Sequence, residues 1–229
     1  MKLLAVSPHL DDAAFSAGGL LAARAAAGWQ VTVATCFTGN VARPTGFALA
    51  CQLDKGIGPE LDYMALRRAD DEEACAALGA VPVHLPFLEA PHRGYDSAAA
   101  LFGQRRHDDD EAERIAPALA GLLHEQAPDL VLAPLCLGDH VDHWIVLAAL
   151  TAVIGERALL LWEDWPYADR HAPVAAPAAL VEPLTPTTRA ARLAACAAYR
   201  SQLGFQFGGA AALAQRLAAI TEERYHSRA

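Results

Sequence analysis

The chain has 229 residues, of which 54% are hydrophobic, and a formal net charge of −9. No cluster of Lys and Arg forms a basic face, so we expect no nucleic-acid partner and no anionic membrane surface as a partner. The five cysteines are scattered without a CxxC pair, and neither a signal-peptide pattern nor an apolar run of membrane-spanning length occurs; these features predict a cytoplasmic protein with reduced thiols.

The first part of the chain predicts a β-α-β unit followed by a long loop. Residues 2–6 predict a buried strand, 15–28 a helix that ends at Gly28, and 29–36 a second strand rich in β-branched residues. Such a unit favours a parallel sheet with a right-handed crossover. The segment 37–62 is rich in glycine and proline, and its length indicates a functional loop or lid.

The remainder of the chain alternates predicted helices and strands. Helices are predicted over 63–78, 110–126, 141–155, 186–203 and 210–224, and strands over 81–87, 129–135 and 158–164, with an edge strand within 174–181. No repeat or low-complexity linker divides this pattern. We therefore expect one α/β domain over residues 1–229, built on a parallel sheet.

A polar cluster, "SPHLDD", follows the first predicted strand. In open α/β sheets, sites form beyond the carboxyl ends of strands. His9 and Asp12 are three residues apart and share one face of a helical turn, so they can bind one metal ion while Asp11 points elsewhere. The alternative is a helix cap, but a single aspartate is enough for a cap. Capping therefore explains neither the second aspartate nor His9.

A second polar cluster, "CLGDHVDH" at 136–143, follows the strand predicted over 129–135. His140 and His143 are again three apart; His143 is a candidate third metal ligand, and Asp142 a candidate to hold the ring of His140 in one tautomer. Taken alone, this cluster is better interpreted as a pair of ordinary surface histidines. Two clusters of matched spacing, each after a predicted strand, favour a joint site.

Two histidines and one carboxylate on one ion form a catalytic zinc pattern, because three protein ligands leave a position for water. Bound zinc lowers the pKa of that water to about 7. Asp11 would then act as general base, and His140 would donate to the oxyanion that forms when water attacks a carbonyl group. The chemistry predicted is metal-assisted hydrolysis of an amide or an ester. A non-haem Fe2+ site uses the same ligands, so the choice between Zn2+ and Fe2+ stays open.

At these residues the sequence resembles a known family. "SPHLDDA" is similar to the (A/S)HPDDE-type motif of the PIG-L/LmbE-like zinc-dependent deacetylases, also called the N-acetylglucosaminylphosphatidylinositol deacetylase family, and "HVDH" at 140–143 is similar to its HPDH motif. "RRADDEEACAALGA" (67–80) and "AAYRSQ" (197–202) resemble two further elements of that family. The resemblance implies a Rossmann-like three-layer α/β sandwich with a mostly parallel sheet.

The resemblance also implies roles for individual residues. It implies Zn2+ ligands at His9, Asp12 and His143, a general base at Asp11, oxyanion stabilisation by His140 and a substrate contact by Arg67, with Arg68 as a second candidate for that contact. The implied activity is removal of an acetyl or other acyl group from an N-acylated amino sugar, glycoside or related small molecule. Whether chains associate as a homo-oligomer stays open.

The sequence departs from the family pattern at Leu10, Ala13 and Val141, and Ala13 removes a carboxylate close to the metal. A metal-binding module that has lost catalysis therefore stays open. An amidase that cleaves a larger amide, such as a thiol conjugate, with the same machinery also stays open. A dinucleotide-binding oxidoreductase is disfavoured because G-x-G-x-x-G is absent. Trp165 and Tyr167, which follow the strand predicted over 158–164, are predicted to pack rather than to stack on a sugar.

Overall fold

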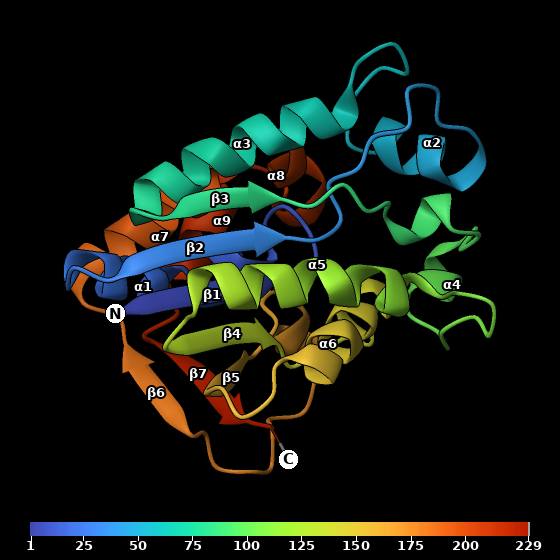
Figure 1. Cartoon of the computed structure of the whole chain (residues 1–229). Helices are drawn as coiled ribbons and strands as arrows, with labels where there is room; N and C mark the ends of the chain where they lie inside the picture. Colours follow the sequence, from blue (N-terminus) through green and yellow to red (C-terminus); the bar gives the residue numbers. More distant parts are fainter. Residues whose placement is uncertain (229) are drawn as a thin grey trace.

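A seven-stranded sheet runs through the computed structural model, which describes residues 1–228 (Figure 1). In spatial order the strands are β3 (Val81–His84), β2 (Gln30–Thr35), β1 (Lys2–Ser7), β4 (Leu130–Pro134), β5 (Leu159–Trp162), β7 (Glu222–Ser227) and β6 (Leu180–Pro183). Neighbours from β3 to β5 pair in parallel, whereas β7 is antiparallel to both β5 and β6. The mostly parallel sheet predicted from the sequence is confirmed.

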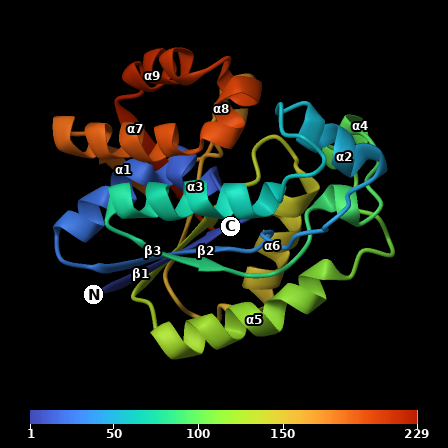
Figure 2. The ribbon, with the colours of Figure 1, turned by 90° about the horizontal axis from the view of Figure 1, so that it is seen from above.

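Helices cover both faces of this sheet, which gives three layers (Figure 2). One face carries α1 (Asp12–Ala26), α3 (Tyr63–Leu78) and α7 (Pro186–Ala198), with α8 (Arg200–Phe207) and α9 (Ala210–Ala218) following α7; the other face carries α5 (Glu111–Gln126) and α6 (Val141–Val153). Among residues 1–228, no helix combines the length and the apolar character that crossing a membrane requires.

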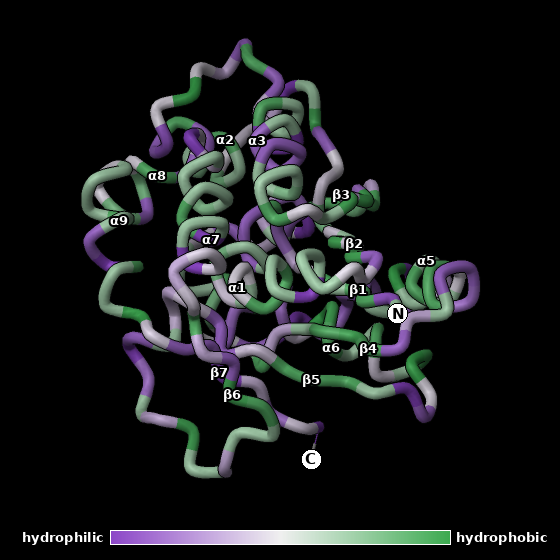
Figure 3. Tube along the Cα trace, turned by 90° about the vertical axis from the view of Figure 1, so that its left-hand side faces the viewer, coloured by the Kyte–Doolittle hydropathy of each residue, from purple (hydrophilic) through white to green (hydrophobic). Residues whose placement is uncertain are grey.

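The central strand β1 contributes to two hydrophobic cores. Leu3 and Ala5 belong to the cluster that includes α1 side chains, whereas Leu4 and Val6 belong to the cluster that includes α5 and α6 side chains. Successive side chains of a strand point to opposite faces, and a parallel strand with helices on both sides buries both sets. Strands β4 and β5 are largely hydrophobic segments of the chain (Figure 3).

The C-terminal region differs from its prediction as one helix over 210–224. The helix α9 ends at Ala218, and β7 inserts between β5 and β6. The buried carboxylate of Glu223 accepts hydrogen bonds from the backbone N–H groups of Gly19 and Leu20, at 2.7 Å and 2.8 Å. This strand therefore depends on long-range partners in α1 that its own sequence does not reveal.

Smaller differences concern boundaries. The edge strand predicted within 174–181 is β6, displaced to Leu180–Pro183, and the helix predicted over 186–203 is divided at Tyr199, whose ψ of 55° is not helical. The first helix begins at Asp12, three residues before the predicted start.

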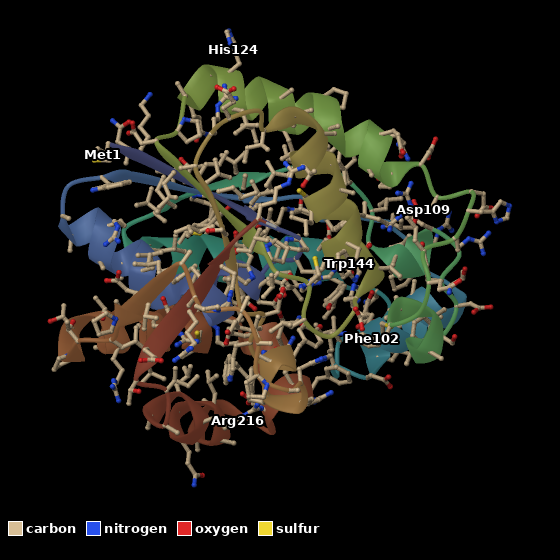
Figure 4. All side chains as sticks on the ribbon, turned by 90° about the horizontal axis from the view of Figure 1, so that it is seen from below. Met1, Phe102, Asp109, His124, Trp144 and Arg216 are labelled. Carbon is tan, nitrogen blue, oxygen red and sulfur yellow. The ribbon has the colours of Figure 1, made fainter. Side chains whose placement is uncertain are left out.

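The connecting segments beyond the carboxyl ends of the strands contain short helices. These are α2 (Gly46–Leu53), η1 (Ala90–His92), α4 (Ala98–Leu101) and η2 (Tyr167–Arg170). Phe102 and Asp109, between β3 and α5, lie at the end of the molecule opposite Met1, which precedes β1 (Figure 4). The polar clusters after β1 and β4 are therefore surrounded by connecting segments.

Candidate active site

The two polar clusters meet because β1 and β4 are neighbours in the sheet. The turn after β1 carries His9 and leads into α1 at Asp12, while His143 lies in the first turn of α6. Oδ2 of Asp12 lies 3.1 Å from Nδ1 of His9 and 3.3 Å from Nε2 of His143. The structure thus brings the three predicted metal ligands together.

These three side chains fit a divalent cation. Each is buried, and their candidate ligand atoms all lie within 4.8 Å of one another. Nε2 of His143 is buried and has no hydrogen-bond partner among the described residues. Because buried polar atoms are normally hydrogen-bonded, a bound ligand is the expected partner of this atom. Two imidazole nitrogens and one carboxylate oxygen suit Zn2+ and also Fe2+.

A second group of potential ligands, His9, His140 and Asp142, is less suitable. Oδ2 of Asp142 lies 2.9 Å from Nε2 of His9, and Oδ1 accepts from the Arg93 guanidinium at 2.7 Å. The guanidinium already supplies a positive charge there and would repel a cation. We therefore assign the candidate metal centre to the first group.

Neither aspartate of the first cluster caps α1 through its side chain. Asp11 occupies the N-cap position without a side-chain capping bond, and Oδ2 of Asp12 accepts from the backbone N–H of His9 at 2.9 Å. The hydroxyl of Ser7 accepts from the N–H of Ala13 instead, at 3.2 Å. The helix-cap explanation of the two aspartates is therefore wrong.

Asp11 lies beside the candidate metal centre without belonging to it. Its Oδ2 accepts from Nε2 of Gln206 at 3.2 Å, and its Oδ1 lies 3.8 Å from the guanidinium of Arg67. Burial and the neighbouring carboxylate of Asp12 raise the pKa of Asp11 to about 7. A carboxyl group in this range can accept a proton and release it near neutral pH.

His140 is held as a neutral hydrogen-bond donor. Its Nδ1 accepts from the backbone N–H of Asp142 at 3.2 Å, so the neutral ring carries its proton on Nε2. Burial, and then the nearby positive charge of His9, lower the pKa of His140 to about 3.

Asp142 contacts the ring of His140 as predicted, but through its backbone N–H and not through its carboxylate. Its carboxylate contacts His9 and Arg93, and only its backbone N–H reaches His140. Residues two apart at a helix start do not face each other, which explains the difference. These partners, of which the His9 hydrogen bond contributes most, hold the pKa of Asp142 well below its usual range despite burial.

The two arginines predicted near the substrate differ in position. Arg67 is buried at 4% exposure, pairs with Glu89 and lines the cavity beside the site. Arg68 donates to the carbonyl oxygen of Thr38 at 2.7 Å and does not line that cavity. Of the two candidates, Arg67 is therefore the one placed to contact a ligand.

A cavity of about 270 Å³ opens beside the candidate metal centre. The segment predicted as a functional loop, 37–62, contributes Asn40 and Phe47 to its wall. Tyr167 also lines it and meets the ring of His143 edge-on, at 5.6 Å between centroids. Trp165 packs against Phe15 as predicted, and Tyr167 packs against the rings of Phe102 and His143.

Several residues at the site have no motif in the sequence. They are Arg93 and Glu89 in the segment after β3, Asp164 after β5, and Gln206 on α8. Asp164 had one usable signal, because it is the last residue of the strand predicted over 158–164, and sites form at the carboxyl ends of such strands. The others reach the site only through tertiary packing.

Comparison with known proteins agrees with this fold. The model of the PIG-L family, described as GlcNAc-PI de-N-acetylase, matches residues 4–154. The chain therefore belongs to the PIG-L family, as the resemblance in its motifs implied.

Individual relatives are deacetylases. The chain is 33% identical over 174 residues to 2'-N-acetylparomamine deacetylase of Streptomyces fradiae, a match that spans 74% of this chain and 59% of that protein. The crystal structure of the A40926 pseudoaglycone deacetylase Dbv21 is similar with a TM-score of 0.82 at 29% identity, covering 98% of this chain and 96% of that one. The zinc inhibited form of teicoplanin deacetylase Orf2 gives a TM-score of 0.79 at 26% identity, with the same two coverages of 98% and 96%.

Proposed function

We propose that this protein is a metal-dependent hydrolase that removes an acetyl or other acyl group from an N-acylated amino sugar of a small glycoside. The observation that carries the proposal is the convergence of His9, Asp12 and His143 on one point, with Asp11 beside them at the wall of a cavity. The relatives named as an N-acetylparomamine deacetylase and a pseudoaglycone deacetylase support the substrate class.

His9, Asp12 and His143 would hold the divalent cation, with Zn2+ as the first candidate and Fe2+ as the second. Bound there, such an ion supplies Lewis acidity, which lowers the pKa of water and withdraws charge from a carbonyl oxygen. The name of the zinc inhibited relative supports a divalent metal at this type of site.

Asp11 is the proton carrier in this proposal. One of its carboxylate oxygens takes a proton from the attacking water, and the same group then gives a proton to the amine nitrogen that leaves. Gln206 and Arg67 keep the carboxylate at the cavity wall through the contacts described above. The products are the carboxylic acid and the free amine.

His140 and Arg67 act on the substrate in this proposal. Nε2 of the neutral His140 donates a hydrogen bond to the amide oxygen as negative charge develops on it. Arg67 is neutralised by Glu89, so its remaining capacity suits neutral polar groups such as sugar hydroxyls.

Two observations bear on the alternative functions. Ala13 is 2% exposed and belongs to a hydrophobic core cluster, so the missing carboxylate leaves the metal ligands and Asp11 in place, which favours an active enzyme over a module that has lost catalysis. The cavity of about 270 Å³ lies at the small end of ligand pockets, which favours a sugar-sized group over a larger thiol conjugate.

Metal analysis of the purified protein, followed by assays of acetate release, tests the proposal. N-acetylparomamine and N-acetylglucosamine glycosides are compared with thiol-conjugate amides, before and after treatment with a chelator. We expect one metal ion per chain, acetate release from the sugars, and loss of turnover after chelation. Activity that persists in fully metal-free protein contradicts the proposal.

The variant Asp11→Asn isolates the proton carrier. It should retain the metal and lose turnover by about 100-fold or more. The control is Asp169→Asn, which removes a surface carboxylate paired with Arg216 and should leave turnover unchanged. Full activity in Asp11→Asn would show that the base is wrongly assigned.

A further inference from the structure

The carboxylate of Asp164, which belongs to neither of the two polar clusters, contacts the ring of His143. Asp164 lies just beyond the end of β5, is 1% exposed, and its Oδ1 is 2.8 Å from Nδ1 of His143. Its Oδ2 accepts from the backbone N–H of Leu137 at 2.9 Å. Oδ2 of this buried carboxylate therefore has a fixed donor, and Oδ1 is an acceptor that faces Nδ1 of His143.

This arrangement decides which nitrogen of His143 can face a cation. When Nδ1 donates its proton to Asp164, the lone pair of Nε2 is free, and Nε2 is the atom that lies 3.3 Å from Oδ2 of Asp12. It is also the atom left without a hydrogen-bond partner among residues 1–228. The carboxylate and the open lone pair thus lie on opposite sides of one ring.

The ring of His9, the other histidine of the candidate metal centre, contacts a carboxylate with different partners. Nε2 of His9 faces Asp142, whose carboxylate also accepts from Arg93 at 2.7 Å and from the N–H of Ala90 at 3.0 Å. In the described part of the chain, Asp164 has no ion pair with Lys or Arg; its ion-pair partner is His143. In that part of the chain, no guanidinium therefore competes with the imidazole of His143 for the negative charge of Asp164, whereas Arg93 pairs with Asp142.

We propose that Asp164 is a positioning residue for the metal centre, which fixes the tautomer and orientation of His143 and strengthens it as a ligand; this rests on the proposed function. Carboxylates behind ligating histidines typically contribute about 10- to 100-fold to metal affinity. Asp164 does not touch the substrate or the cation and acts through His143 alone.

The substitution Asp164→Asn gives a sharp prediction because of Leu137. The N–H of Leu137 requires an acceptor, so the asparagine turns its carbonyl oxygen toward it and its NH2 group toward His143. Nδ1 of His143 must then accept, and its proton moves to Nε2, the side that faces Asp12. The variant thus favours the tautomer of His143 with its proton on Nε2, which cannot bind a metal ion through that atom. It also removes the negative charge of Asp164.

The test measures the zinc dissociation constant by competition with a chromophoric chelator. We expect Asp164→Asn to weaken zinc binding about 10- to 100-fold relative to the unchanged protein. The matched control is Glu163→Gln, the adjacent carboxylate, which pairs with His226 at 2.9 Å away from the centre. That control should bind zinc as the unchanged protein does.

A double-mutant cycle separates positioning from a general structural role. In the background His143→Ala, the further change Asp164→Asn should have no effect on zinc affinity, because its route of action is gone. Thermal melts of the metal-free variants check folding, and Asp164→Glu, which keeps the charge but displaces it by one methylene, provides a second variant with an expected intermediate loss.

The outcomes distinguish the two proposals. If the unchanged protein binds no zinc or Fe2+, the proposed metal centre itself is wrong. If the unchanged protein binds zinc and Asp164→Asn binds it equally well, or loses equal affinity with and without His143, the role of Asp164 is overturned while the metal centre stands.

Discussion

Nε2 of His9 lies 2.9 Å from Oδ2 of Asp142, although the two residues are 133 positions apart in the sequence. The same carboxylate accepts from Arg93 and from the backbone N–H of Ala90. It therefore joins three segments: the turn after β1, the start of α6 and the short helix η1. Asp142 is fully buried, so these hydrogen bonds replace all of its hydration.

The first prediction is that Asp142→Asn destabilises the metal-free protein by about 2–4 kcal/mol. Every donor around this carboxylate needs an acceptor, and the asparagine replaces one oxygen with an NH2 group. Urea unfolding measures the change. The control is Asp108→Asn, which removes half of an exposed ion pair with Arg106 and should leave the free energy of unfolding nearly unchanged. Equal losses in the two variants would contradict the prediction.

The fold was predictable where local pattern and burial agree. The apolar runs of β1, β2, β4 and β5 are buried on both faces, so their sequences carry the signal of a parallel sheet. Strand β7, with sequence EERYHS, was not predictable, because a charged segment after a helix looks like its continuation. Long-range contacts, such as that of Glu223 with α1 and the burial of Tyr225 in the core, explain why this segment is extended and inserted in the sheet.

The site was predictable where it is made of short-range motifs. The i, i+3 spacing of His9 with Asp12, placed after a strand, indicated residues that the structure brings into contact with His143. Arg93 and Gln206 carried no signal, because their contacts depend on the path of segments that have no regular periodicity or that follow a break in a helix. The prediction that the carboxylate of Asp142 contacts His140 was wrong for a related reason, because residues that are close in sequence were assumed to have side chains that face each other.

The second prediction concerns pH and applies to the metal-free protein. Burial disfavours the charged ring of His143, but the carboxylates of Asp12 and Asp164 outweigh it and raise its pKa from 6.5 to about 9. The folded state then binds this proton more tightly than the unfolded state does. The resulting stabilisation is complete below pH 6.5 and is lost as the pH rises through about 9.

Urea unfolding of chelator-treated protein at several pH values between these limits measures this effect. The difference in free energy of unfolding between the unchanged protein and His143→Gln should shrink as the pH rises. A difference that stays constant or grows with pH would show that His143 is not held as a cation in the metal-free protein.

The third prediction is that Gln206→Ala lowers kcat about tenfold, which corresponds to about 1.4 kcal/mol, and leaves KM nearly unchanged. Nε2 of Gln206 donates to Oδ2 of Asp11 at 3.2 Å, so its loss frees the proton carrier to leave its position. Steady-state assays of acetate release measure both constants. Gln215→Ala, at an exposed position of α9, is the control. A rise in KM with unchanged kcat would instead indicate that Gln206 binds the substrate.

The fourth prediction concerns the loop between β4 and α6, which delivers His140. Three of its residues have positive φ: Cys136 at 67°, Gly138 at 95° and Asp139 at 57°. A Cβ atom added at Gly138 would lie 2.8 Å from Cβ of Tyr167, which lines the cavity. Gly138→Ala therefore combines an unfavourable backbone conformation with a steric clash at the cavity wall.

We expect Gly138→Ala to lower the free energy of unfolding by about 1–3 kcal/mol and to reduce turnover, because the loop must shift and carry His140 with it. Gly121→Ala is the matched control: Gly121 lies in α5, and a Cβ there meets no atom within 4 Å. Since glycine is a poor helix former, this control should gain about 0.5–1 kcal/mol. Urea unfolding and acetate release measure both variants. If Gly138→Ala were as stable and as active as the control, the loop would not be constrained by Tyr167, and the position of His140 would have to depend on other contacts.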